Sequence, residues 1–437
     1  MTSTALLTDH YELTMLQGAL RSGAARRHCV FEVFARGLPE GRRYGVVAGT
    51  GRLLEAVQAF RFGGAEIDRL RTAGVVDSQT LDFLSGYRFS GNIRGYAEGE
   101  CFFPRSPLLV VEGTFAESVV LETVLLSILN HDSAIASAAS RMTNAAGDRP
   151  CIEMGSRRTH EWAAVAAARA AYIAGFATTS NLEAGRTHGI PTAGTSAHAF
   201  TLLHDDERAA FEAQVACLGP GTTLLVDTYD VAAAVSLAVQ VAGIGLGAVR
   251  LDSGDLLVQA REVRAQLDAL GAKDTRIIVT SDLDEHAIAA LAAAPVDAYG
   301  IGTSLVTGSG APTAGLVYKL VAREDDAGNL IDVAKTSKDK ISVGGRKWAL
   351  RRLNSRGEAE AEIIGIGQMP AADDDHPSLQ TRPLPVDLMR DGEIVADLSL
   401  DAARRRHERS RAELPPRALQ LSRGEPAIPT FFEDERH

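Results

Sequence analysis

Between residues 151 and 303, short apolar or Gly-rich runs that end in polar residues alternate with Ala-rich helical stretches. The expected strand ends lie at Cys151–Gly155, Phe176–Ser180, Pro191–Thr195, Leu224–Asp227, Val249–Asp252, Ile277–Ser281 and Tyr299–Gly302. A regular alternation of strand and helix is typical of parallel βα units in an α/β fold. Seven units within about 150 residues favour an irregular (β/α) barrel, and an open doubly wound sheet is the alternative that the same periodicity allows.

Composition and charge exclude some classes of partner for a chain of this kind. The formal net charge is −11 and the sequence has no dense Lys/Arg block, so nucleic acid is not expected as a partner. The longest apolar stretches are rich in Ala and Gly and too weak to predict a membrane span. Four cysteines form no C-x-x-C pair, and the first residues lack the basic and apolar regions of a signal peptide, so we expect a cytoplasmic protein.

Polar residues at the C-terminal ends of barrel strands converge on one face, so the residues at the strand ends form the candidate site. They are Arg157, Arg158, Thr179, Ser180, Thr195, His198, Asp227, Asp230, Arg250, Asp252, Asp255, Ser281, Asp282 and Thr303. Arg binds phosphate as a planar fork, carboxylates accept from ribose hydroxyls or hold Mg²⁺, and hydroxyl and backbone N–H groups complete an anion site. This set of side chains therefore suits a phosphorylated sugar.

Two Gly-containing runs at strand exits each have a functional and a structural interpretation. In Arg250–Asp255, Asp252 lies at the strand exit and Asp255 can cap the next helix. In Tyr299–Ser304, two glycines let backbone N–H groups approach an anion. A plain βα turn with an N-cap also explains the first run, and a tight barrel turn also explains the second.

Single residues at the rim have the same two interpretations. His198 lies three residues beyond Thr195, where a neutral imidazole can be a base, a metal ligand or a phosphate acceptor. No H-x-x-x-H or Cys partner lies nearby, which argues against a metal site, and a lone His is more often structural. Asp227 is expected to face the rim, and Asp230 to cap the following helix. Near the N-terminus, Tyr11 offers a flat ring for stacking on a heteroaromatic ligand.

Six runs taken together resemble nicotinate phosphoribosyltransferases, from Leu7 to about Lys347. The runs are Thr8-Asp9-His10-Tyr11, Glu153-Met154-Gly155-Ser156-Arg157-Arg158, Gly194-Thr195-Ser196-Ala197-His198, Asp227-Thr228-Tyr229-Asp230, Arg250-Leu251-Asp252-Ser253-Gly254-Asp255 and Gly300-Ile301-Gly302-Thr303-Ser304. Each run alone is a weak signal. Their order and spacing on successive predicted strands make the set specific.

The resemblance implies an α/β fold with an irregular (β/α) barrel of the type II phosphoribosyltransferase kind. We expect residues 121–319 to form this barrel with the active site. Residues 1–120 and 320–437 are expected to form a discontinuous flanking α+β domain with a peripheral C-terminal tail. The sequence after Lys347 has no usable motif and lacks the Cys-rich zinc module of some relatives.

The resemblance also implies a reaction in NAD salvage. Nicotinate and 5-phosphoribosyl 1-pyrophosphate give nicotinate mononucleotide and pyrophosphate, and ATP hydrolysis is coupled to this transfer through a phosphohistidine. The matching histidine is His198, and ATP with Mg²⁺ is the co-substrate. Asp227 and Asp252 would meet ribose or the Mg²⁺ that substrate phosphates bring, without a fixed protein metal site.

The family's substrate contacts match further residues of this chain. Arg157 and Arg250 would meet phosphate or the nicotinate carboxylate, and Gly302 and Thr303 would bind the ribose 5′-phosphate. Thr195 belongs to the same substrate-binding set.

The pyridine ring in this family lies between an aromatic residue of the barrel and a Tyr of the partner subunit. Tyr11 matches that Tyr, so a head-to-tail homodimer with shared active sites is implied. Phe176 is the candidate for the ring on the barrel side.

The segment Thr178–Ser180 bears on substrate choice. Nicotinamide-using relatives place an Asp near these positions, whereas here Thr179 or Ser180 can donate to a carboxylate, which favours nicotinate. The alternatives are a nicotinamide- or quinolinate-using phosphoribosyltransferase, or a silent paralogue that only binds nucleotide. The quinolinate enzyme leaves His198 unexplained, and a silent paralogue predicts damaged motifs, whereas the six runs are intact.

Overall fold

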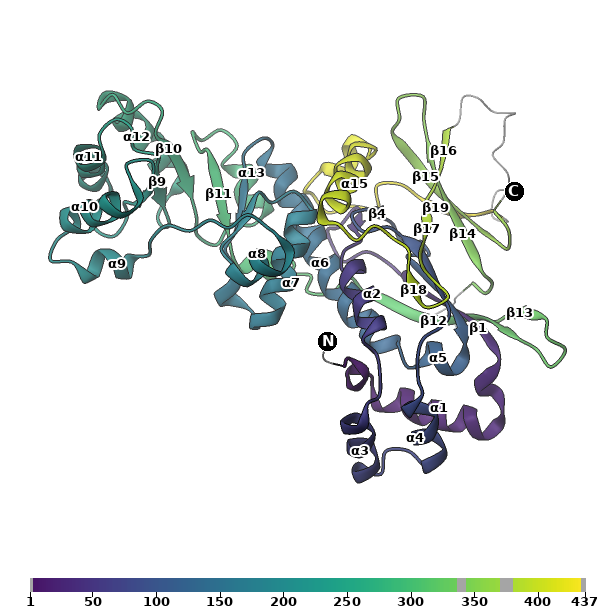
Figure 1. Cartoon of the computed structure of the whole chain (residues 1–437). Coiled ribbons are helices and arrows are strands. Elements are labelled where there is room, and N and C mark those ends of the chain that lie inside the picture. The colour runs from purple at the N-terminus through teal and green to yellow at the C-terminus, as the bar shows by residue number, and fades with distance from the viewer. Residues whose placement is uncertain (1–2, 336–342, 370–379, 434–437) are drawn as a thin grey trace. The chain divides into compact units, whose positions relative to one another are not determined.

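The computed structural model describes residues 3–335, 343–369 and 380–433 (Figure 1). The chain divides into two compact units. Unit 1 combines Met1–Ser137 with Thr313–His437, and unit 2 is the segment Ala138–Pro312. Helix α6 (Glu122–Ala146) carries the chain from the first unit into the second.

Unit 2 is built on a six-stranded parallel sheet with the order β7-β6-β11-β10-β9-β8. Its strands are β6 (Cys151–Glu153), β7 (Thr178–Thr179), β8 (Thr223–Leu225), β9 (Ala248–Leu251), β10 (Arg276–Val279) and β11 (Ala298–Ile301). The last strand, β11, pairs with the first, β6, which is the neighbour relation of a barrel and not of a simple open sheet. The predicted α/β class and irregular barrel are thus confirmed.

The predicted strand at Pro191–Thr195 is wrong, and its loss leaves the barrel incomplete. This segment forms only an isolated parallel bridge, between Thr179 and Thr192. Pro191 has no N–H to donate to a neighbouring strand, and Gly194 and Thr195 are exposed and unsupported by packing. Strand β8 therefore pairs with β9 alone, and the sheet curls without closing.

Helices follow most strands of unit 2, and Figure 1 shows α10, α11 and α12 on the outer side of β9 and β10. They are α7 (Glu161–Ile173), α8 (Leu182–His188), α9 (His198–Leu203), α10 (Glu207–Leu218), α11 (Val231–Ala242), α12 (Leu256–Ala269), α13 (Glu285–Ala290) and α14 (Thr303–Val306). The carboxylates of Asp230 and Asp255 accept backbone N–H groups at the starts of α11 and α12. The predicted capping roles of Asp230 and Asp255 are confirmed, because both carboxylates bind the N-termini of helices.

The described residues of unit 1 form three sheets. Seven strands form the largest, β1 (His28–Ala35), β3 (Asn92–Tyr96), β5 (Leu109–Thr114), β12 (Leu316–Glu324), β13 (Leu330–Asp332), β17 (Pro385–Arg390) and β18 (Glu393–Ile394). Four form the second, β14 (Lys347–Leu353), β15 (Ala359–Ile366), β16 (Gln380–Pro383) and β19 (Thr430–Phe432). The pair β2 (Gly45–Val46) and β4 (Cys101–Phe102) forms the third.

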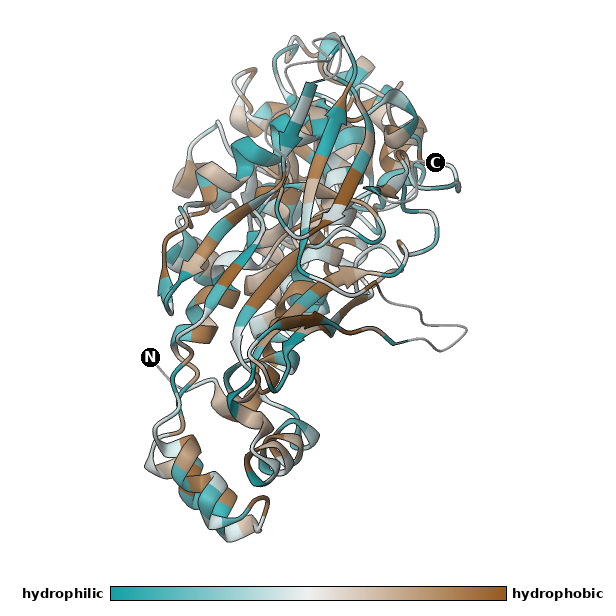
Figure 2. Ribbon diagram, turned by 90° about the vertical axis from the view of Figure 1, so that its right-hand side faces the viewer, coloured by the Kyte–Doolittle hydropathy of each residue, from teal (hydrophilic) through white to brown (hydrophobic). Residues whose placement is uncertain are grey.

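The helices of unit 1 pack with these sheets around one apolar core. They are α1 (His10–Ser22), α2 (Thr50–Gln58), α3 (Gly64–Ala73), α4 (Ser78–Ser85), α5 (Phe115–Val119) and α15 (Leu400–Ala412). Hydrophobic and hydrophilic segments alternate along the strands, as expected for sheets with one buried face (Figure 2).

The C-terminal tail, which the sequence suggested to be peripheral, is built into unit 1. Strand β17 pairs with β3, and β19 pairs with β15. Helix α15 buries Ala403, His407 and Ser410 along one face. The polar composition of the tail concealed this, because the buried face of α15 includes His407 and Ser410 and so shows no apolar periodicity.

A buried ionic cluster joins the tail to the sheets. The side chain of Arg351 in β14 is fully buried and donates to Glu100 at 2.8 Å and to Glu362 at 2.6 Å. It also donates to the hydroxyl of Ser410 in α15 at 3.1 Å. Burial of Glu100 is outweighed by Arg351 and its other partners, so the pKa of Glu100 falls to about 2. Arg382 also donates to Glu100, whereas Arg351 is the cation that pairs with Glu362 among the described residues.

His407 predicts a pH dependence for unit 1. Burial, reinforced by the charge of Arg411, lowers the pKa of His407 to about 4, so the unfolded chain takes up this proton first. We expect stability that is present above about pH 6.5 to fall by up to roughly 3 kcal/mol as pH drops towards 4. Urea unfolding from about pH 7.5 to about pH 5 should show this loss, and His407→Gln should flatten it. An equal pH slope in wild type and variant would contradict the assignment.

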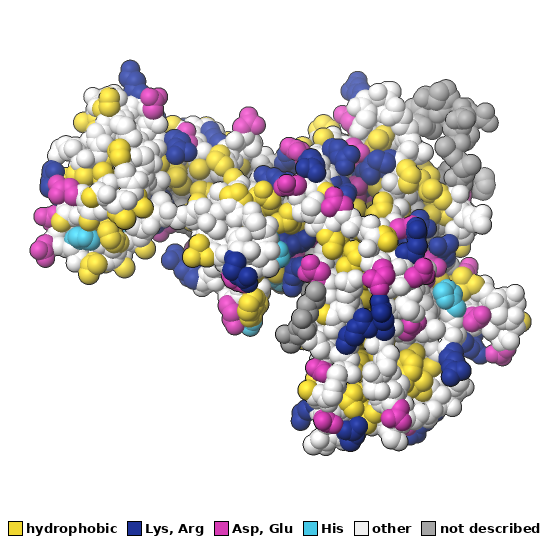
Figure 3. Space-filling view, viewed as in Figure 1, with side chains coloured by type: hydrophobic (Ala, Val, Ile, Leu, Met, Phe, Trp, Pro, Cys, Tyr) yellow, Lys and Arg dark blue, Asp and Glu magenta, His cyan; other side chains and the backbone are white. Residues whose placement is uncertain are grey.

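In the described part of the chain, no helix is both long and apolar enough to cross a membrane. On the face shown in Figure 3, Lys and Arg side chains are interspersed with Asp and Glu, and no large basic area is visible there.

Candidate functional site

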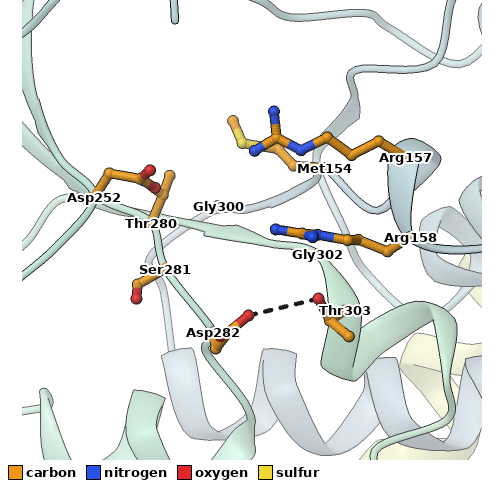
Figure 4. A pocket seen from close by; sticks show the side chains of 10 residues that line it. All are labelled: Met154, Arg157, Arg158, Asp252, Thr280, Ser281, Asp282, Gly300, Gly302 and Thr303. Atoms are coloured by element: carbon orange, nitrogen blue, oxygen red, sulfur yellow. Dashed lines mark hydrogen bonds between the residues drawn. The ribbon is translucent and has the colours of Figure 1, made fainter. Parts of the chain in front are cut away.

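A cavity of about 230 Å³ lies within unit 2 at the carboxyl ends of its strands (Figure 4). Its lining residues are Met154, Arg157, Arg158, Asp252, Thr280, Ser281, Asp282, Gly300, Gly302 and Thr303. They follow or end β6, β9, β10 and β11, because parallel strands deliver their carboxyl ends to one edge. Arg157, Asp252, Gly302 and Thr303, which were predicted from separate runs, are brought together here.

His198 faces two carboxylates beside this cavity. It is the first residue of α9, and its Nε2 lies 3.8 Å from Asp227 Oδ1 and 3.8 Å from Asp252 Oδ2. On the other side of the ring, Nδ1 lies 3.2 Å from the hydroxyl of Thr228. The imidazole is 40% exposed, so a ligand can reach it.

Asp227 is a buried acid, and one of its two carboxylate oxygens accepts no hydrogen bond from the described residues. Its side chain is 2% exposed, and Oδ2 accepts from the N–H of Asp252 at 2.9 Å and from the hydroxyl of Ser253 at 2.8 Å. Its Oδ1 has no hydrogen-bond donor among the described residues. Asp252 in turn accepts from the hydroxyl of Thr280. A buried carboxylate oxygen without a donor is a place for a cation or a ligand hydroxyl.

Arg250 adds a partly buried positive charge. It donates to the hydroxyl of Thr195 at 3.2 Å, and its Nε has no acceptor among the described residues. Burial lowers the pKa of Arg250, the carboxylates of Asp252 and Asp227 oppose this, and the nearby charge of Arg157 reinforces it. Two guanidinium groups that approach each other in this way favour a bound anion between them.

The two glycines of the predicted phosphate loop differ in how much room a side chain would have at each position. A Cβ at Gly300 would lie 2.5 Å from Thr280 Cγ2 and 2.7 Å from Met154 Sδ, so packing alone requires glycine at that position. A Cβ at Gly302 would meet nothing closer than 3.3 Å, so this glycine is not explained by packing in the same way. Ser281 lies across the cavity with a φ of 106°, a strained backbone for a residue other than glycine.

Phe176, Thr179 and Ser180 do not line this cavity. Thr179 is buried and its hydroxyl donates to Glu153 at 2.5 Å, whereas Ser180 is exposed. Phe176 is 1% exposed, so its ring offers no free face for stacking. Tyr11 belongs to unit 1, where it is 44% exposed on α1.

Sequence reasoning missed three residues of this region. Met154 is the apolar side chain of the cavity lining, Glu153 is the acid behind Thr179, and Thr228 is the partner of His198. All three stand inside runs that had been singled out for their Arg, His and Asp residues. The signal was present, but nothing in the sequence says which way each side chain of such a run points.

The donor set fits a Mg²⁺ ion that arrives with phosphates better than a resident metal. No group of three or more His, Cys, Asp or Glu side chains that could hold a metal occurs in the described ranges. Asp227 and Asp252 provide hard oxygen ligands, one of them an oxygen without a donor. Mg²⁺ commonly takes one or two carboxylates and completes its shell with water and substrate phosphate.

Comparisons with known proteins agree along the whole chain. The family model described as the nicotinate phosphoribosyltransferase (NAPRTase) N-terminal domain matches residues 6–130. The nicotinate phosphoribosyltransferase pncB1 of Mycobacterium tuberculosis is 59% identical over 434 residues, which cover 97% of this chain and 94% of that protein. Human nicotinate phosphoribosyltransferase is 32% identical, with 84% and 80% covered. The crystal structure of human nicotinic acid phosphoribosyltransferase matches with a TM-score of 0.82 and 27% identity over 98% of both chains.

Proposed function

The chain belongs to the nicotinate phosphoribosyltransferase family, and from this premise we propose that it joins nicotinate to 5-phosphoribosyl 1-pyrophosphate with coupled ATP hydrolysis. The products are nicotinate mononucleotide and pyrophosphate, in NAD salvage. The observation that carries the proposal is the convergence of His198, Asp227 and Asp252 beside a cavity that also presents Arg157 and Arg158.

The ribosyl transfer requires charge stabilisation more than proton transfer. As the bond from the anomeric carbon to pyrophosphate breaks, positive charge develops on the sugar and negative charge on the leaving group. Asp227 and Asp252 lie where they can hold the ribose hydroxyls, and Arg157 and Arg250 where they can hold the departing polyphosphate or the nicotinate carboxylate. Mg²⁺, carried by the phosphates and held by Asp227 or Asp252, would neutralise part of the leaving charge.

The sugar phosphate is assigned to the opposite side of the cavity. Gly302 leaves room for a close approach to its backbone, and the hydroxyl of Thr303 lies 3.5 Å from Asp282 Oδ1 (Figure 4). Backbone N–H and hydroxyl groups of this kind form anion sites.

ATP coupling is assigned to His198. The carboxylates of Asp227 and Asp252 favour the proton on Nε2, which leaves the lone pair on Nδ1, beside the hydroxyl of Thr228. Nδ1 would attack the γ-phosphorus of ATP, forming an N–P bond as the P–O bond to the leaving ADP breaks. Water would later attack the same phosphorus and release phosphate, restoring the imidazole.

The pyridine ring needs an apolar face, and Met154 provides one at the cavity. Its thioether makes favourable contacts with aromatic rings, so Met154 replaces Phe176 as our candidate for the barrel side of nicotinate. The other face is assigned to Tyr11 of the partner subunit in a homodimer. Tyr11 and Met15 lie four residues apart on α1 and are 44% and 40% exposed, and Leu7, in the short helix before α1, is 60% exposed. A partner would cover these apolar side chains.

A comparison of three pyridines tests the proposal. With phosphoribosyl pyrophosphate, Mg²⁺ and ATP, we expect pyrophosphate release with nicotinate and little with nicotinamide or quinolinate. Equal turnover of nicotinamide would support the amide-using alternative. Binding of nucleotide without turnover of any pyridine would support the silent paralogue.

A further inference from the structure

Hydrogen bonds from one buried carboxyl group join the end of β6 to the end of β7. Glu153 is the last residue of β6 and is fully buried. Its Oε2 accepts from the hydroxyl of Thr179 at 2.5 Å, and its Oε1 accepts from the N–H of Gly155. Its backbone carbonyl accepts from the N–H of Ser180 at 2.8 Å. The position of the turn after β6 and of the loop after β7 therefore depends on one side chain.

These hydrogen bonds extend to residues that face the cavity. The hydroxyl oxygen of Thr179 accepts from the N–H of Asn181 at 2.9 Å, and the Asn181 amide donates to the hydroxyl of Ser156 at 3.0 Å. Ser156 lies in the same turn as Arg157 and Arg158, which line the cavity. A displacement of the Glu153 carboxyl group would thus move both the arginine turn and the exposed Ser180.

This arrangement is costly for a purely structural contact. No Arg or Lys pairs with Glu153 in the described ranges, and burial raises the pKa of its carboxyl group despite the hydrogen bonds from Thr179 and Gly155. Burying an acid without a cation lowers the stability of a protein. An acid that is kept in such a place is expected to be needed for the contacts that its carboxyl group makes. The Thr179 hydroxyl and the Gly155 N–H each donate to a different oxygen of the Glu153 side chain. Glu offers two acceptor oxygens, whereas Gln offers only one.

We propose that Glu153 is a positioning residue for the pyridine substrate. It occupies the hydroxyl of Thr179 and accepts from the N–H of Ser180, which fixes the loop after β7 beside the arginine turn. At the same time it holds the turn of Arg157 at the same end of the site. This inference rests on the proposed function and deepens it by naming the group that shapes the acid-binding side.

Steady-state kinetics of matched variants test the role. Glu153→Gln can keep only one of the two acceptor contacts and Thr179→Val removes the Thr179 hydroxyl, so each is expected to raise KM for nicotinate about tenfold. In this inference Arg157 meets the nicotinate carboxylate and the sugar phosphate is held from β10 and β11, so KM for phosphoribosyl pyrophosphate should stay within about twofold. Thr179→Ser keeps the hydroxyl and should restore the wild-type KM for nicotinate.

A control and a double variant complete the test. Thr178→Val removes the neighbouring hydroxyl, which is buried without a partner in the described structure, and should change neither KM. The double variant of Glu153→Gln with Thr179→Val should be no worse than the worse single one, because both remove one contact.

The results of these experiments distinguish a failure of the inference about Glu153 from a failure of the proposed function. A parallel change of kcat and both KM values, or a loss of thermal stability alone, would make Glu153 an ordinary structural residue and overturn the inference. Thr179→Val is isosteric, so it decides the matter if Glu153→Gln does not fold. Failure of the wild type to use nicotinate would overturn the proposed function, and this inference with it.

Discussion

His198→Ala is expected to take up no phosphate from ATP and to lose all stimulation by ATP of the transfer to nicotinate. In wild type we expect acid-labile phosphate on the protein after incubation with Mg²⁺ and ATP, and an increase in kcat/KM when ATP is added. Coupling between two sites commonly amounts to about 5–150-fold, and this factor should vanish in the variant. The reason is positional, because the proposal makes His198 the nucleophile, and its side chain is 40% exposed and lies 3.8 Å from both Asp227 and Asp252.

The residual activity of this variant separates two roles of the histidine. The ATP-independent transfer should persist, because Asp227, Asp252 and Arg157 remain in place to stabilise the transition state. His204→Ala is the matched control, since His204 follows the same short helix but bonds to the carbonyl of Phe200 at 2.8 Å. Full ATPase activity with full coupling in His198→Ala would rule out the phosphohistidine.

Arg351→Met is expected to lower the free energy of unfolding of unit 1 by about 3–5 kcal/mol. The substitution leaves Glu362 buried without its cation and leaves Glu100 with Arg382 alone. Burial already raises the pKa of Glu362 despite Arg351, so its charged form depends on that cation. Fluorescence of Trp348, which is buried in the same strand, reports the unfolding in urea. Trp162 is exposed in unit 2, and a Trp162→Phe background leaves Trp348 as the single tryptophan.

Arg352→Met provides the matched control for Arg351→Met. Arg352 is the next residue of β14, and its ion pair with Glu360, at 3.4 Å, is partly exposed. Exposed pairs contribute at most about 1 kcal/mol, so this variant should unfold close to wild type. Equal losses of unfolding free energy in the two variants would show that stability depends on the charge of the strand and not on the buried cluster around Arg351.

Sequence patterns predicted the fold class and most strand positions of unit 2 because local periodicity records which residues are buried. They failed at Pro191–Thr195, where the chain makes only a single bridge, from Thr192 to Thr179, and forms no strand. They also missed how the tail packs, because its contacts are distant in sequence. Arg351 and Ser410, for example, are 59 residues apart and meet in a buried hydrogen bond.

The sequence predicted that Asp227 and Asp252 follow neighbouring strands and that His198 and Arg250 belong to the same set of runs, and with that the family and the chemistry they suit. Only the tertiary structure decided which side chains share a space. It turned Thr179 towards Glu153 and buried Phe176, and it placed Asp227 and Asp252 at equal distances from His198. The physical reason is that strand order and periodicity are local, whereas the direction of a side chain at a strand end depends on hydrogen bonds and packing from other strands.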